Sequence, residues 1–205
     1  MQRRHFLMTD ITKFERLKDI GCLMWFPLNA TYGLNDVIGG RTIVKERGSL
    51  TPQASGSYLI TTGARIAYIN ISDLTSDDFD NGNYTTFSQV RRYENSIFRS
   101  TAALFDVNGI KIASGYQNNT SSTANWTNDS WNEGVIVRYK SGHREIYENR
   151  SLFINDDSGS YPDIWNYSTI NIKSPNNMRI YTRNFLLFNK ALTSSEVVEV
   201  HKLIS

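Results

Sequence analysis

The hydrophobic residues of this chain recur mostly at every second position, in short runs separated by polar turns rich in Gly, Asn and Ser. Such alternation predicts β-strands, because successive side chains of a strand point to opposite faces. Runs in which β-branched and aromatic residues dominate occupy 41–45, 58–62, 64–71, 84–90, 96–105, 110–113, 134–140, 143–147, 151–154 and 170–172. The pattern therefore predicts a fold made mainly of short antiparallel strands.

Two of the turns predict tight hairpins. The dipeptide Asn108-Gly109 lies between two predicted strands, and Asn-Gly readily supplies the positive φ angles of a two-residue turn. The dipeptide Ser141-Gly142 has the same place between the next pair of strands. We therefore expect strands that are adjacent in the sequence to pair at these two points.

The C-terminal segment predicts a strand that leads into one helix. Ser194 or Ser195 is placed to cap the helix, and apolar residues then recur at helical spacing. The positions expected to be buried are Ile180, Phe185, Leu187 and Leu192 before the helix and Val197, Val200 and Leu203 within it.

The N-terminal residues 1–20 are expected to form an arm that precedes the β-domain. Within the arm, residues 9–19 predict a short amphipathic helix that ends at Gly21 and buries Ile11, Phe14 and either Leu17 or the stem of Lys18. Isolated termini fray unless they are packed, so we expect the arm to pack on the domain or on a partner, which is a second protein or another copy of the chain. The candidate docking residues are Arg3, Arg4, Phe6 and Phe14.

The two ends of the β-region resemble a known family. Residues 23–29 read Leu-Met-Trp-Phe-Pro-Leu-Asn, and an Asn- and Gly-rich turn follows at 35–40. Residues 178–192 read Met-Arg-Ile-Tyr-Thr-Arg-Asn-Phe-Leu-Leu-Phe-Asn-Lys-Ala-Leu, and a Ser-x-x-Glu helix start follows. These segments resemble the ends of the concanavalin A-like lectin/glucanase superfamily, in its laminin-G-like and pentraxin-like branch. The resemblance implies an all-β, two-sheet antiparallel jelly-roll sandwich over 21–205, with a short C-terminal helix and the N-terminal arm.

Composition excludes several classes of protein. The 22 Lys and Arg residues nearly balance the 20 Asp and Glu residues, which argues against a nucleic-acid-binding surface. No apolar run approaches the about 20 residues of a membrane-spanning helix, so no membrane insertion is expected. The single Cys22 cannot form an internal disulfide, and the apolar run 6–8 is too short for a signal peptide. We therefore expect synthesis in the cytosol without a signal peptide.

A glycoside hydrolase is the enzyme class to test first, since the resemblance includes glucanases. Laminarinase-type members use Glu-x-Asp-x-Glu, which places the nucleophile and the general acid on the same face of one strand. The nearest string here holds Glu145 and Glu148, whose spacing of three sends the two carboxylates to opposite faces. A solvated hairpin is therefore the preferred interpretation of this pair, and a catalytic pair is the alternative.

Other catalytic patterns are missing from the sequence. His5, His143 and His201 are far apart and have no second ligand at metal-binding spacing, and Gly-x-Ser-x-Gly does not occur. The protein is therefore predicted not to be an enzyme.

Calcium is the one candidate cofactor, and the protein is expected to require no cofactor. The acidic loops 77–83 and 155–159 contain Asp78, Asp80, Asp156 and Asp157, and laminin-G-like relatives hold calcium at a loop rim. Neither loop fits the EF-hand template. Asp and Asn also favour turns for backbone reasons, so plain turns are the simpler interpretation.

Glycan binding requires aromatic faces beside amide and carboxylate groups. The candidates are Tyr116, Trp126, Trp131, Tyr161 and Trp165, all in polar segments expected to be loops. The alternative is that these loop tryptophans fold back over the sandwich edges, where each ring buries a large apolar area. Trp25, by contrast, is expected in the core.

A lectin-like fold usually faces extracellular sugars, yet the sequence predicts cytosolic synthesis. A phage virion protein resolves this conflict, because virion proteins are made in the host cytosol and are released by lysis. The preferred hypothesis is thus a non-enzymatic module on a virion surface, such as a head fibre, a capsid decoration or a tail fibre, that binds host cell-surface glycans. A stand-alone lectin and a glycoside hydrolase with an unrecognised carboxylate pair are the alternatives.

Overall fold

The computed structural model describes residues 2–46, 49–53, 58–61, 67–92, 105–108, 110–113, 131–157, 162–173 and 180–205, with the backbone alone for 2–10, 49, 58–61, 92, 110, 111, 113 and 180. Its helices are α1 (Gln2–Ile20) and α2 (Ser194–Ile204), with short 3-10 turns η1 (Ser76–Asp78), η2 (Asp80–Gly82) and η3 (Ile164–Asn166). Its strands are β1 (Cys22–Phe26), β2 (Ile43–Lys45), β3 (Ser49–Pro52), β4 (Tyr58–Thr61), β5 (Ala67–Asn70), β6 (Tyr84–Arg92), β7 (Phe105–Val107), β8 (Ile110–Ala113), β9 (Asn132–Arg138), β10 (Arg144–Glu148), β11 (Ser151–Asp156), β12 (Thr169–Ile172) and β13 (Ile180–Phe188).

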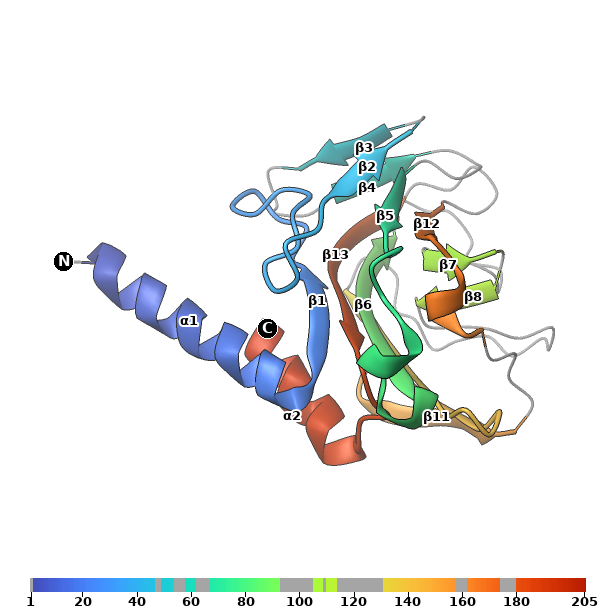
Figure 1. Cartoon of the computed structure of the whole chain (residues 1–205). Helices are drawn as coiled ribbons and strands as arrows, with labels where there is room; N and C mark the ends of the chain where they lie inside the picture. Colours follow the sequence, from blue (N-terminus) through green and yellow to red (C-terminus); the bar gives the residue numbers. More distant parts are fainter. Residues whose placement is uncertain are drawn as a thin grey trace.

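The described elements form three layers (Figure 1). An eight-stranded antiparallel sheet lies in the middle, in the order β11-β10-β9-β6-β13-β4-β3, with β1 also paired to β13. A five-stranded sheet, in the order β2-β5-β12-β7-β8, packs on one face, and α1 and α2 lie on the other. This arrangement confirms the predicted two-sheet antiparallel sandwich with a C-terminal helix and an N-terminal arm.

Strand β13 organises the larger sheet. It pairs with β6 along one side, and with β4 and then β1 along the other. A bulge interrupts the β6 pairing between Arg183 and Phe185, where Asn184 has φ +51°. Asn tolerates this left-handed conformation better than most residues, and the extra residue turns the Asn184 side chain toward the helices. The chain therefore closes by pairing its first strand with its last.

The alternation of β13 supplies both cores. Phe185 and Leu187 face the second sheet, where they pack with Phe26 and Phe105. Leu186 and Phe188 face the helices, and the apolar core there also contains Leu17, Ile20, Trp25, Phe87, Val135, Val137, Val197 and Val200. Burial of residues of both parities explains why 185–188 reads as a continuous apolar run rather than an alternating one.

Helix α2 begins one residue earlier than predicted. Its N-cap is Thr193, not Ser194 or Ser195: Thr193 Oγ1 accepts from the backbone N–H of Glu196 at 3.3 Å, and Glu196 Oε2 accepts from Thr193 N at 2.8 Å. This reciprocal pair is a capping box. Val197 and Val200 are buried as expected, but Ile204 is buried and Leu203 only partly buried, because seven residues complete about two turns and bring Ile204 onto the face of Val197.

Helix α1 is longer than the predicted 9–19 segment and ends as expected before Gly21, whose φ is +100°. Leu17 is fully buried against the sheet, and Phe14 is partly buried. The prediction for Ile11 was wrong, because 57% of this residue is exposed. The N-terminal half of α1 extends away from the sheets (Figure 1).

Most strand predictions are confirmed to within a few residues. The β7–β8 and β9–β10 hairpins form as expected, and Asn108 and Gly142 have positive φ angles. The predicted strand 96–105 lies outside the described residues except for Phe105, which begins β7. Trp25 is buried, as predicted.

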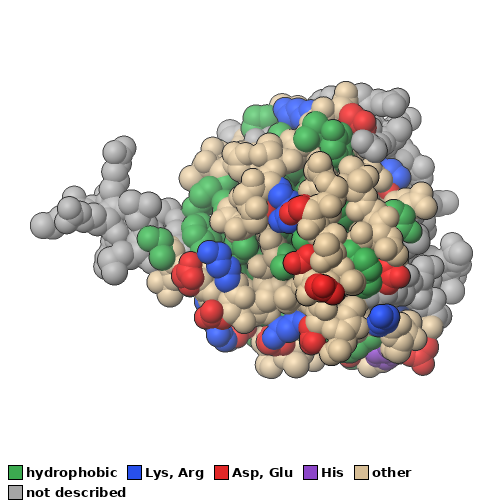
Figure 2. All heavy atoms as spheres, in the orientation of Figure 1, with side chains coloured by type: hydrophobic (Ala, Val, Ile, Leu, Met, Phe, Trp, Pro, Cys, Tyr) green, Lys and Arg blue, Asp and Glu red, His purple; other side chains and the backbone are tan. Residues whose placement is uncertain are grey.

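The surface shows no region dominated by one sign of charge in the view of Figure 2, where acidic and basic side chains are interspersed. Among the described helices, none combines the length and the apolar character that crossing a bilayer requires.

Candidate functional site

The structure separates the two predicted glycan-binding aromatics that it describes. Trp131 immediately precedes β9 and lies against Arg91, near the end of β6. Trp165 packs on Phe79, with ring centroids 5.1 Å apart, and Phe79 packs on Tyr84 at the start of β6. About seven residues of strand, or about 23 Å, separate these ends of β6. Trp131 and Trp165 therefore cannot form one platform, whereas Tyr116, Trp126 and Tyr161 lie outside the described residues.

Trp165 follows the packing alternative. Its ring is partly buried against the core between the two sheets, and the 3-10 turn η3 that carries it also buries Ile164. Trp131 instead lies on the helix-facing side of the larger sheet, past the C-terminal end of α2. The candidate site is built around Trp131.

The strand register produces a two-row grid on this face. Gln89 of β6 pairs with Glu133 of β9 on one side and with Arg183 of β13 on the other. Two residues further along β6, Arg91 pairs with Tyr181, and Trp131 lies two residues before Glu133. Because side chains on one face recur every second residue, all six project toward the same side.

The outer row (Arg91, Trp131 and Tyr181) forms an arginine–aromatic patch together with Arg183 of the inner row, and by this patch we mean these four residues. The guanidinium carbon of Arg183 lies 4.2 Å from the centroid of the Trp131 ring, and that of Arg91 lies 5.5 Å from the same ring. Arg91 also lies 4.7 Å from the Tyr181 centroid. These are cation–π distances, so the aromatic rings hold both guanidinium groups in place. All four residues are partly exposed.

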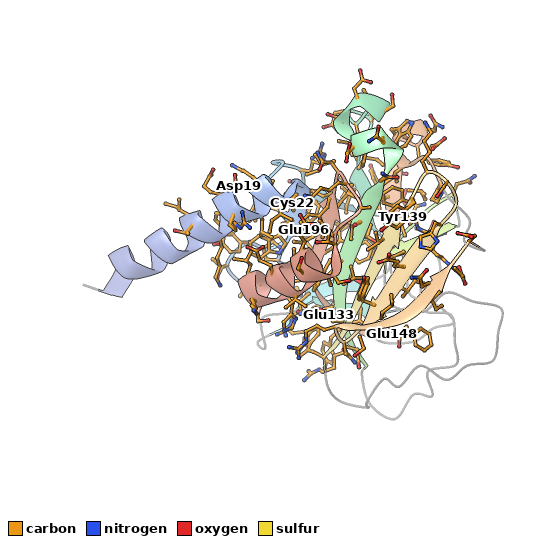
Figure 3. All side chains as sticks on the ribbon, turned by 90° about the horizontal axis from the view of Figure 1, so that it is seen from below. Asp19, Cys22, Glu133, Tyr139, Glu148 and Glu196 are labelled. Atoms are coloured by element: carbon orange, nitrogen blue, oxygen red, sulfur yellow. The ribbon has the colours of Figure 1, made fainter. Side chains whose placement is uncertain are left out.

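The inner row is a buried polar network beneath the end of α2. Gln89 Nε2 donates to Glu133 Oε2 at 3.3 Å, and the same oxygen contacts Nδ1 of His201 on α2. Gln89 Oε1 accepts from Arg183 Nε at 2.8 Å and from Asn184 Nδ2 at 3.1 Å. Figure 3 labels Glu133 beside α2. Glu133 Oε1 has no hydrogen-bond partner among the described residues, although Glu133 is 4% exposed.

The charges of the patch are unbalanced. Burial lowers the pKa of the Arg183 guanidinium, the nearby positive charge of Arg91 lowers it further, and Glu133 partly offsets both effects. The Glu133 carboxylate is held by Gln89 and His201, and it forms no ion pair with either arginine in the described part of the chain. In the part of the chain that the structure describes, two arginine charges therefore share one buried carboxylate that is already hydrogen-bonded.

The acidic residues predicted to bind calcium have local partners. Asp78 Oδ2 accepts from the backbone and the hydroxyl of Thr75, at 2.7 and 3.0 Å, so it completes a turn. Asp80 lies in the adjoining turn η2, where its Oδ1 accepts from Asn81 at 2.9 Å. Within the described ranges, no three His, Cys, Asp or Glu side chains gather at metal-binding distance.

The two acidic residues of the second segment, Asp156 and Asp157, also have hydrogen-bond partners. Asp156 receives two hydrogen bonds from Arg144, at 2.7 and 3.1 Å, and Arg144 is almost fully buried. Asp157 Oδ1 lies 2.8 Å from Nδ1 of His143. Asp78 and Asp80 thus have hydrogen bonds typical of turns, whereas Asp156 ends strand β11 and pairs with Arg144 on the neighbouring strand.

The Glu145 and Glu148 carboxylates lie on opposite faces of β10, as their spacing predicts. Glu145 faces the helix side and accepts from Tyr147 Oη at 2.7 Å and from Tyr139 Oη at 3.3 Å. Glu148 is buried on the other face, so the predicted solvated position was wrong for this residue. Burial first, and then the Glu145 charge, raise the pKa of the Tyr139 hydroxyl. The pair lacks the shared face that a retaining glycosidase needs.

The arm uses Phe14 within its own chain. The Phe14 ring meets Trp25 edge-on at 5.5 Å and Tyr32 at 6.1 Å. Arg16 holds α1 to α2 through Glu199, with Nε–Oε1 at 2.6 Å. The side chains of Arg3, Arg4 and Phe6 lie outside the described set. Phe14 therefore anchors the arm to its own domain.

Sequence reasoning identified Trp131 and missed Arg91, Tyr181 and Arg183. The signal was present as two period-two pairs, Gln89-x-Arg91 and Tyr181-x-Arg183. Neither pair indicates a site by itself, because the pairing of β6 with β13 joins segments about 90 residues apart.

Comparisons with known proteins identify the fold. No protein-family model and no curated protein matched the chain. Solved structures of botulinum neurotoxin binding domains are similar in fold. The binding domain of neurotoxin DC in complex with SialylT has a TM-score of 0.61 and 15% identity, over 89% of this chain and 52% of that one. The same domain bound to rat synaptotagmin II gives 0.57 and 16%, over 89% and 52%.

A type C neurotoxin structure is similar to the same degree. It has a TM-score of 0.59 and 15% identity, over 91% of this chain and 53% of that one. The entry of that toxin into cells depends on interaction with two ganglioside molecules. The chain described here spans about half the length of these structures. At this identity the likeness establishes a shared fold.

Proposed function

We propose that the protein is a non-enzymatic recognition module that binds a glycan at the arginine–aromatic patch. The observation that carries the proposal is the patch itself, in which Trp131 and Tyr181 position two arginines on an accessible sheet face. Sites for sugars combine aromatic surface with a few fixed polar donors, and this patch has both. The fold agrees with the concanavalin A-like resemblance that the end segments carry.

Two further observations support a binding role. Solved structures that share the fold include binding domains in complex with SialylT and with rat synaptotagmin II, and a neurotoxin whose cell entry depends on two ganglioside molecules. The best carboxylate pair for hydrolysis, Glu145 and Glu148, is divided between two faces of one strand. A platform for recognition is thus better supported than a hydrolytic site.

The test is a glycan-array screen of the full chain, run with calcium and again with chelator. Trp131→Ala is expected to abolish binding, because both guanidinium groups lose the ring that holds them. Trp165→Ala is the matched control, since it removes another partly buried tryptophan at the opposite end of β6 and is expected to leave binding intact. Melting temperatures confirm that both variants fold. A blank array under both conditions would overturn the proposal.

Comparison of the two array conditions tests the calcium prediction at Asp78, Asp80, Asp156 and Asp157. Binding that needs calcium and is lost when Asp78 or Asp156 is replaced by Asn would support a calcium site at that loop. Binding that is unchanged by chelator would remove calcium from the proposal.

A second proposal concerns attachment, and the projection of α1 favours it. The N-terminal half of α1 extends beyond the sandwich, with Ile11 exposed, while Phe14 and Leu17 fix the other half to the domain. Short helices are marginal in water unless something packs on them. We therefore propose that residues 2–12 dock on an assembly, such as a virion surface, from which the domain projects.

The attachment proposal has its own test. Deletion of residues 2–12 is expected to leave cooperative melting intact, because the described packing of α1 on the domain starts at Phe14. The same deletion should abolish association with the assembly or with a second copy, measured by sedimentation. Unchanged sedimentation of the full chain and the truncated chain, with no assembly partner retained by either, would rule the proposal out.

A further inference from the structure

The guanidinium groups of Arg91 and Arg183 carry more hydrogen-bond donors than their described neighbours use. A guanidinium has five N–H donors. Arg183 directs Nε to Gln89 Oε1 at 2.8 Å. Within the described part of the chain no other hydrogen bond leaves either side chain, and neither arginine forms an ion pair. Among the described residues, four donors of Arg183 and all five of Arg91 therefore have no acceptor.

Among the described residues, the acid that acts on Arg183 is Glu133, and it does not balance these charges. Glu133 Oε2 is already bound by Gln89 and His201, and its side chain is buried beneath the end of α2. Burial, and then the nearby charge of Arg91, lower the pKa of Arg183 and so disfavour its charged form. An anion placed between the two arginines would relieve this repulsion and would gain charge-assisted hydrogen bonds.

The aromatic rings define where such an anion enters. A guanidinium group lies 4.2 Å from the Trp131 centroid and a second lies 5.5 Å away, so the arginines occupy the stacking position that a sugar ring would take. Trp131 is thus a positioning residue rather than a stacking platform. The planar donor edges of the arginines are what the patch offers to a ligand, and that geometry matches two-oxygen anions.

We infer that the patch takes an acidic glycan, and that Arg91 and Arg183 jointly hold its anionic group, a carboxylate or a sulfate. This inference rests on the proposed function, because it names the class of sugar bound at the same site. Tyr181 borders the group through its contact with Arg91, and Glu133 sets the inner limit of the site by repelling an anion that moves toward α2.

The experiment compares neutral glycans with their sialylated and sulfated counterparts, and uses lactose, 3′-sialyllactose and 3′-sulfolactose as the reference series. We expect an acidic member to bind at least about tenfold more tightly than its neutral core, as one or two charge-assisted hydrogen bonds would give. The advantage should shrink as NaCl rises. The sialylated and sulfated arms show which anion is preferred.

Variants locate the effect. Arg91→Gln is the cleaner substitution, because the Arg91 side chain forms no hydrogen bond with described residues, and it should remove the acidic preference while the melting temperature stays unchanged. Arg183→Lys keeps the charge but loses the fork, and should weaken binding in part. Arg16→Gln, which removes an arginine on the α1 surface, is the charge-matched control and should have no effect.

Two results separate this inference from the proposed function. Equal binding of neutral and acidic members, or an acidic preference that survives Arg91→Gln, would overturn the inference and leave a glycan-binding module. Absence of binding to every glycan, neutral and acidic, would overturn both.

Discussion

The indole N–H of Trp25 donates to Oδ1 of Asn184 at 3.0 Å, across 159 residues of sequence. Trp25 lies in the first strand and Asn184 is the bulge residue of the last. The Asn184 amide then donates to Gln89 Oε1 and to the carbonyl of Ile204. One side chain in a left-handed conformation therefore joins β1, β6, β13 and the end of α2.

Replacing Asn184 by Ala is expected to destabilise the fold by about 2–3 kcal/mol, because it leaves the buried Trp25 N–H without its acceptor. Denaturant unfolding measures the change. Trp25→Phe and the double variant complete a cycle, and the two effects should be coupled by about 1 kcal/mol. Additive effects would show that the hydrogen bond contributes little.

Thr193→Ala is expected to cost about 1 kcal/mol of unfolding free energy, since Thr193 caps α2. Ser195→Ala, at one of the two positions favoured by the sequence pattern, should cost less because its hydroxyl bonds Thr193 Oγ1 rather than a free helix N–H. Thermal melts of the two variants rank the caps. A larger loss at Ser195 would contradict the observed capping box.

Stability is expected to fall in acid partly through Glu196. Burial alone would raise the pKa of this carboxyl, but hydrogen bonds from Lys190 and Thr193 and the Lys190 charge hold it below the ordinary glutamate value. A lowered folded pKa means that the contribution is present above the unfolded value of about 4.3 and is lost as the pH falls through the folded pKa.

Glu196→Gln should therefore lower stability at pH 7 and flatten the pH dependence below about pH 4.3, which denaturation at several pH values measures. Glu15→Gln, on the exposed face of α1, is the control and should leave the profile unchanged. An identical acid slope for Glu196→Gln and the parent would contradict the assignment.

The Cys22 thiol is expected to resist modification in the folded protein. Burial, and then the charge of Asp36, raise its pKa well above the ordinary value, and the thiolate is the reactive form. A colorimetric thiol reagent should react at the rate of unfolding. Val44→Cys adds a thiol at a position that is 41% exposed, and one equivalent should then react at once. Rapid labelling of the parent would show that β1 opens locally.

The period-two pattern predicted the strands and both hairpins because it reports the local conformation of the chain. The helical spacing of apolar residues predicted Ile11 to be buried, which was wrong, because an amphipathic stripe on a helix does not specify how far the underlying domain reaches. The cap was predicted at Ser194 or Ser195 because Thr193, Ser194 and Ser195 all have suitable hydroxyls. The hydrogen bond from the backbone N–H of Glu196 to Thr193 decides among them.

The site was less predictable than the fold because its residues come from strands that are far apart in the sequence. Trp131 was identified as an aromatic residue in a polar segment. Arg91 and Arg183 lie next to it only because β9, β6 and β13 are neighbours in the sheet. Strand order depends on contacts that a single sequence does not display. Residues that share a face can be predicted strand by strand, but their neighbours across strands cannot.

The packing of α1 on α2 can form only when almost the whole chain has been synthesised. Arg16 and Glu199 are 183 residues apart, so at about 5–20 residues per second the ribosome produces the partner helix about 9–37 s after the arm. Until then, Leu17 and Ile20 on α1 have no complete core to join. Leu17 and Ile20 thus stay exposed to solvent for most of the translation time, and chaperones or an assembly partner can bind them before the domain closes.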